Sequence, residues 1–107
     1  MKKYYKILLI LPLLAVACHG NSSKNFKIGK FTVKIIDVEN GRYGYDIYKD
    51  TSLLIHQPVI PAASGNSGFM KEKDAERVAR LVVTKLNSRH NPSITTGELD
   101  SLKIVHR

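Results

Sequence analysis

Two side chains in this sequence, His56 and Asp46, could together perform acid–base chemistry. They lie in two short segments rich in β-forming residues, so we expect them on neighbouring strands. A histidine oriented by a carboxylate could act as a general base or donate a hydrogen bond to a ligand. The alternative is structural: His56 would hydrogen-bond loop carbonyls and order the chain after Pro58, and we favour this interpretation.

The expected strand register does not place these two residues opposite each other. A turn centred on Asp50 and Thr51 sets Asp46 against Ile55, one residue away from His56. A direct pair therefore requires a register shift or a β-bulge between the two strands.

Other catalytic and ligand-binding patterns are missing from the sequence. Ser64 and Ser67 lack the strand–turn–helix context that activates a serine, and the Gly-Asn-Ser-Gly stretch lacks the Lys-Ser/Thr of a phosphate loop. The histidines at positions 19, 56, 90 and 106 do not have metal-ligand spacing. We therefore expect no nucleophile, no metal site and no cofactor.

Three segments have the pattern of strands, and short connections favour an antiparallel meander. Residues 26–38 alternate apolar and polar side chains, and Asn40-Gly41 is a strong hairpin signal before residues 43–49. Residues 53–57 form the third segment, which ends at Pro58.

Residues 71–88 have the pattern of an amphipathic helix. Their apolar stripe consists of Ala75, Val78, Ala79, Val82 and Leu86. Thr95 and Glu98 form a capping-box pattern before a short C-terminal helix. The sequence thus predicts an α+β fold, a three-stranded antiparallel meander packed on one amphipathic helix with a short C-terminal helix.

The segment between the third strand and the long helix is the expected binding surface. Loops of this length on a rigid sheet commonly carry binding residues. The candidate residues are His56, Gln57, Val59, Ile60 and Ala63. The alternative, which the sequence leaves open, is that the segment covers the sheet edge and packs Phe69 into the core.

The N-terminus has the pattern of an export signal. Three lysines precede a short apolar run, which is too short to span a bilayer. The run ends in Ala-Val-Ala-Cys, which resembles a bacterial lipobox and implies a diacylglycerol on Cys18, the only cysteine. We expect residues 1–17 to be a lipoprotein signal peptide, residues 18–25 the lipidated cysteine and tether, and residues 26–107 one small domain. No acidic residue closely follows Cys18, so we expect the outer membrane, on its periplasmic side.

The chain is strongly basic, and part of this charge lies in the signal. Three of its 17 cationic residues precede Cys18, which leaves 14 against nine anionic residues, a net charge of +5. Lys24, Lys27, Lys30 and Lys34 have no acidic residue among them. Without interleaved aromatic residues they do not predict nucleic-acid binding. We favour a solvated strand edge, with attraction to anionic headgroups as a secondary effect.

A set of motifs runs from residue 43 to about residue 102, over residues 43–48, 55–58, 60–62, 65–66, 68–69, 74–76, 78–79, 92–95 and 98–99. Together these motifs resemble a family of small bacterial lipoproteins defined by domain of unknown function 4907. Met70-Lys71 departs from it, because a Ser or Thr cap is expected at the helix start. The resemblance implies the fold and the anchoring but no activity.

Two classes of function remain. The sequence favours a membrane-anchored, noncatalytic lipoprotein that binds an envelope protein or a cell-wall component, and that meets the lipid bilayer through acylated Cys18. The alternative is a small envelope hydrolase or modifying enzyme that uses His56 and Asp46.

Overall fold

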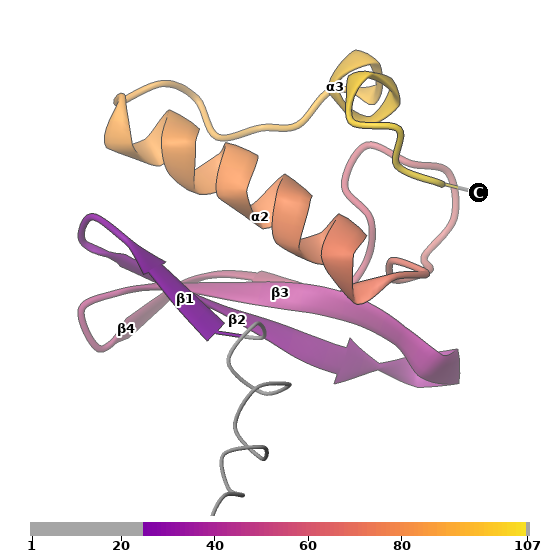
Figure 1. Ribbon diagram of the computed structural model, residues 1–107, viewed down its shortest axis with the longest axis horizontal. Coiled ribbons are helices and arrows are strands. Elements are labelled where there is room, and N and C mark those ends of the chain that lie inside the picture. The colour runs from indigo at the N-terminus through magenta and orange to yellow at the C-terminus, as the bar shows by residue number, and fades with distance from the viewer. Residues whose placement is uncertain (1–24, 107) are drawn as a thin grey trace, which may run out of the picture.

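The computed structural model describes residues 25–106, which form a sheet covered on one face by the longer of two helices (Figure 1). The antiparallel sheet has the strand order β1-β2-β3-β4. Its elements in chain order are β1 (Asn25–Ile28), β2 (Phe31–Val38), the 3-10 turn η3 (Glu39–Gly41), β3 (Arg42–Lys49), β4 (Ser52–Gln57), α2 (Glu72–Asn87) and α3 (Thr96–Ser101). The expected signal peptide, the lipidated cysteine and most of the tether lie outside the described residues.

The sheet has four strands, so the prediction of three was wrong. The single strand expected over residues 26–38 is the β1–β2 hairpin, which turns at Gly29 and Lys30. Gly29 has φ +60°, which glycine adopts without the steric cost of a Cβ. The apolar alternation changes phase here, because Ile28 and Phe31 are three positions apart instead of two.

The second hairpin confirms the Asn-Gly signal. Asn40 and Gly41 have φ angles of 61° and 68°, the left-handed conformation that a type I′ turn requires. Val38 pairs with Arg42 across the three residues of η3, and this register runs down to Phe31 opposite Lys49.

The core lies between the sheet and α2, and the predicted α+β arrangement is confirmed in this respect. Its buried apolar residues are Phe31, Val33, Ile35, Tyr45, Ile47, Ile60, Phe69, Ala75, Val78, Ala79, Val82, Val83, Ile94, Leu99 and Ile104. Four members of the predicted helical stripe are buried, but Leu86 is only partly so. Val83 is fully buried instead, because the buried stripe of α2 turns toward this residue at its C-terminal end.

The two helices begin differently. Lys71, which precedes α2, provides no side-chain cap, as the departure at Met70-Lys71 suggested. In contrast, α3 has the predicted capping box: the Thr95 side chain accepts from the Glu98 backbone N–H, and the Glu98 side chain accepts from the Thr95 backbone N–H.

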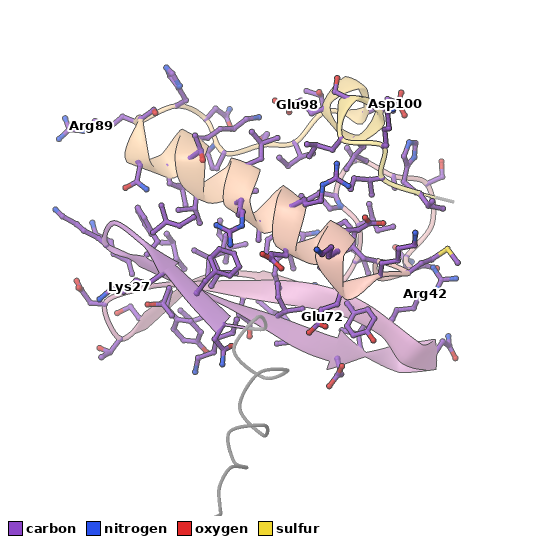
Figure 2. All side chains as sticks on the ribbon, in the orientation of Figure 1. Lys27, Arg42, Glu72, Arg89, Glu98 and Asp100 are labelled. Atoms are coloured by element: carbon purple, nitrogen blue, oxygen red, sulfur yellow. The ribbon has the colours of Figure 1, made fainter. Side chains whose placement is uncertain are left out.

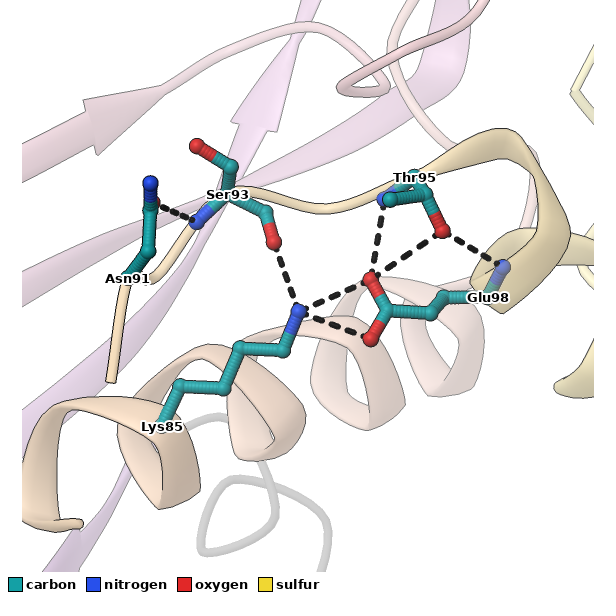
Figure 3. Close-up of polar contacts among 5 residues, drawn as sticks. All are labelled: Lys85, Asn91, Ser93, Thr95 and Glu98. Atoms are coloured by element: carbon teal, nitrogen blue, oxygen red, sulfur yellow. Dashed lines mark hydrogen bonds and ion pairs between the residues drawn. The ribbon is translucent and has the colours of Figure 1, made fainter.

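A charged contact fastens α3 to α2 (Figure 3). Lys85 Nζ on α2 lies 2.7 Å from Glu98 Oε2 and donates to the Ser93 carbonyl oxygen at 2.6 Å. The hydrogen bond from Lys85, followed by that from the Thr95 backbone, lowers the pKa of Glu98 below its ordinary value. The capping residue of α3 is therefore also the residue that ties this helix to α2.

Candidate functional site

The structure brings His56 and Asp46 together. A register irregularity between Ile47 and Tyr48 shifts β4 relative to β3, so that Asp46 pairs directly with His56. This is the kind of β-bulge on which a direct pair depended. His56 Nδ1 lies 2.5 Å from Asp46 Oδ1, and the side chains are 56% and 14% exposed, respectively.

The contact fixes how the imidazole can be used. With a carboxylate accepting from Nδ1–H, the second ring nitrogen remains available to a ligand or to solvent. A histidine held this way has the orientation of a general base. The hydrogen bonds to loop carbonyls that the structural interpretation assigned to His56 are not among the contacts within residues 25–106; the loop is ordered instead by Gln57, whose Nε2 donates to the Val59 carbonyl oxygen at 2.8 Å.

The pair lies on the sheet face opposite the helices. Lys34 pairs with Asp46 in the register, so Lys34, Asp46 and His56 form one row across β2, β3 and β4. Lys34 Nζ lies 5.0 Å from the centroid of the Tyr48 ring, within range of a cation–π contact. In the part of the chain that the structure describes, no helix covers this face (Figure 1).

A separate pocket lies where β2 ends and β3 begins, between the turn η3 and the loop of residues 58–68. Its volume is about 300 Å³. Its lining consists of Val38, Glu39, Asn40, Arg42, Pro58, Val59, Asn66, Ser67 and Gly68. Neither His56 nor Asp46 contributes to it.

Backbone pairing holds the loop on β3 and so forms the pocket. Tyr43 and Phe69 exchange two backbone hydrogen bonds, of 2.9 and 2.7 Å. The loop is closed on itself by the Ile60 N–H, which donates to the Ser67 carbonyl oxygen. Arg42 lies at the η3 end of the sheet (Figure 2). Its Nη1 donates to the Gly68 carbonyl oxygen at 3.3 Å, which holds the guanidinium beside the loop that lines the pocket.

Close backbone approach makes Gly68 necessary at this place. A Cβ on Gly68 would lie 2.6 Å from Val38 Cγ2 and 2.7 Å from the Tyr43 carbonyl oxygen. Any larger residue would push the loop away from β3. The position of the pocket wall therefore depends on glycine at position 68.

The predicted binding residues separate into different environments. Val59 lines the pocket, and Gln57 orders the loop through its side-chain hydrogen bond. Ile60 is only 4% exposed and belongs to the core, so placing its side chain on a binding surface was wrong. The apolar side chain turns inward because the loop folds over the sheet end. Ala63 is half-buried against the same core, and Cys18 lies outside the described residues.

Several pocket residues were not anticipated. Arg42 and Asn40 lie in or beside the hairpin turn, where the sequence indicated only a change of direction, and Asn66 and Ser67 lie in the loop. Only the folded loop brings these two segments together. The one local signal in the sequence was the arginine at position 42, directly after the Asn40-Gly41 turn, because it places a hydrogen-bond donor at this end of the sheet.

The pocket lining combines polar side chains with apolar ones. Arg42, Asn40, Asn66 and Ser67 offer hydrogen-bond donors, while Val38, Pro58 and Val59 offer apolar contact. Glu39 is the single carboxylate, and no histidine, cysteine or lysine accompanies it in the lining. Within residues 25–106, no cluster of three or more His, Cys, Asp or Glu side chains could hold a metal ion.

Taken together, the sheet and its two helices define a small α+β fold with a pocket at one end of the sheet. The chain belongs to the family defined by DUF4907, a domain of unknown function, which matches residues 34–101. The match begins on β2 and ends with α3, and it includes every residue of the pocket lining. No match was found among curated proteins or among solved structures.

No helix within residues 25–106 has the length and apolar character needed to cross a bilayer.

Proposed function

We propose that this protein is a noncatalytic lipoprotein of the cell envelope, anchored through Cys18, which binds a partner in the pocket between η3 and the loop of residues 58–68. The observation that carries the proposal is the pocket itself, a cavity of about 300 Å³ with several hydrogen-bond donors and an apolar wall. A polar and apolar lining of this kind orients a ligand and excludes water without supplying a reacting group. The partner would be an envelope protein or a cell-wall component.

One observation favours the alternative, a small hydrolase, and that is the His56–Asp46 pair. A general base must lie within hydrogen-bond reach of a held substrate. Here the imidazole is more than half exposed on an uncovered sheet face, outside the lining of the pocket. This placement supports binding over hydrolysis, and we keep the enzyme as the second candidate.

The anchor is tested by Cys18→Ser. The variant should move from the membrane fraction to the soluble fraction, because two or three acyl chains hold a protein far more firmly than a short apolar segment does. The measurement is fractionation after a carbonate wash. A variant that stays in the washed membranes would show that Cys18 is not the anchor. Protease accessibility on intact cells tests the expected periplasmic side of the outer membrane.

The pocket is tested by placing a photo-crosslinking residue at Val59 in cells. We expect one discrete adduct, because a partner seated in the pocket would lie against this side chain. The matched control is the same residue at Val105, which is exposed and outside this pocket. Arg42→Lys should weaken the adduct at position 59, since lysine cannot reproduce the planar set of donors. Equal labelling from both positions would overturn the assignment.

A further inference from the structure

Cations without an ion pair gather in the half of the sheet that holds the β1–β2 turn. Lys27 on β1, Lys30 in the β1–β2 turn and Lys34 on β2 are all exposed, and none has an ion pair within residues 25–106. The cations of α2 differ, because three of them are paired with carboxylates. These pairs are Arg77 with Asp74, Arg80 with Glu76 and Lys85 with Glu98.

Two exposed leucines lie at the same end. Leu53 and Leu54 are 53% and 48% exposed, which is unusual for large apolar side chains in a small domain. Leu53 pairs with Tyr48, Tyr48 pairs with Thr32, and Thr32 pairs with Lys27. Leu53 and Lys27 therefore share the uncovered face at the end where β1 turns into β2 and β3 turns into β4. Leu54 and Lys30 lie at the same end, and Lys34 lies on the same face midway along β2.

Protection of a sheet edge explains only part of this arrangement. Lysines on edge strands discourage pairing with another chain, and Lys27 on β1 fits this role. Lys34 lies on β2, which is paired on both sides, so it guards no edge. Edge protection also gives no reason for two exposed leucines on β4.

We propose that this end, the lysine–leucine tip formed by Lys27, Lys30, Lys34, Leu53 and Leu54, docks on an anionic lipid bilayer. Basic residues are attracted by acidic headgroups, while neighbouring apolar side chains enter the interface. The inference rests on the proposed anchor at Cys18. Only six residues separate Cys18 from Asn25 at the start of β1, so the tether reaches at most about 25 Å.

Docking by the tip would also orient the pocket. The pocket lies at the opposite end of β2, whose eight residues extend about 26 Å. With the tip on the bilayer, η3 and the loop of residues 58–68 face the aqueous space, where a partner can reach them.

The test uses the full lipidated protein, purified and reconstituted into vesicles of phosphatidylcholine with or without phosphatidylglycerol. A nitroxide label is placed on Leu53→Cys or on Met70→Cys, because Cys18, the chain's single natural cysteine, carries the lipid in the proposed anchor. Met70 is a matched control, being 50% exposed and beside Phe69 near the pocket. On anionic vesicles the label at position 53 should lose most of its accessibility to a water-soluble nickel chelate, and the label at position 70 should keep it.

Charge variants identify the cause. Lys27→Glu with Lys34→Glu should restore chelate access to position 53 on anionic vesicles. Lys73→Glu with Lys103→Glu makes the same change in net charge on exposed positions outside the tip and should leave the label protected. Circular dichroism of each variant confirms that it is folded.

The outcomes separate the two proposals. A wild-type protein that fails to float with the vesicles overturns the anchor, and the docking with it. A protein that floats while position 53 remains as accessible as position 70 overturns the docking alone. Protection at position 53 that is equal with and without phosphatidylglycerol, or that survives reversal of the tip lysines, also overturns it.

Discussion

Phe69→Ala should reduce the free energy of unfolding by about 3–5 kcal/mol, the usual cost of truncating a fully buried phenylalanine. Phe69 has no exposed surface, and its ring centroid lies 6.2 Å from that of Tyr45. The residue also ends the pocket loop and exchanges backbone hydrogen bonds with Tyr43. Urea unfolding followed by circular dichroism measures the loss, which is a large share of a small domain's total stability.

Leu86→Ala is the matched control for this prediction. Both substitutions remove a large apolar side chain, but Leu86 is only partly buried at the end of α2. Its loss should therefore be clearly smaller than that of Phe69. Equal losses from the two variants would contradict the assignment of Phe69 as the central contact between loop and core.

Periodicity and turn chemistry were enough to predict the second hairpin and both helices. Local patterns specify these elements. Asn40-Gly41 favours the left-handed turn, and the side chains of Thr95 and Glu98 accept hydrogen bonds from backbone N–H groups at the start of α3. The β1–β2 turn was missed because Gly29-Lys30 interrupts the alternation by a single position. With so small a change in the alternation, two short strands are easily predicted as one long strand.

The candidate site was less accessible to sequence reasoning, since it depends on contacts between distant segments. The bulge that brings His56 opposite Asp46 results from how β4 packs beside β3, and a simple turn count places these residues one position apart. The pocket likewise needs η3 and the loop of residues 58–68 in one place. Val59 was predicted from its loop alone, whereas Arg42 becomes part of the site only through its contact with Gly68.

Gly44→Ala should also destabilise the fold strongly. A Cβ at this position on β3 would lie 2.5 Å from the Gln57 carbonyl oxygen and 2.8 Å from Pro58 Cα. Both atoms belong to the backbone, so they cannot be displaced by a side-chain rotation. We expect a loss of about 1–3 kcal/mol in unfolding free energy, the usual range for overpacking. Because Pro58 lines the pocket, the crosslink from position 59 should also weaken.

Gly97→Ala is the control that separates steric conflict from a general effect of replacing glycine. Gly97 lies in α3, and the nearest atom to its Cβ position is Thr95 Oγ1, at 3.8 Å. Alanine fits there without conflict and has the higher helix propensity, so stability should be unchanged or rise by up to about 1 kcal/mol. A Gly44→Ala protein as stable as Gly97→Ala would mean that the chain at Gln57 and Pro58 can move off β3 at little cost. In that case the pocket wall would not be held by the close approach of β3 and the loop, and its position would depend on Arg42 and the Tyr43–Phe69 pairing alone.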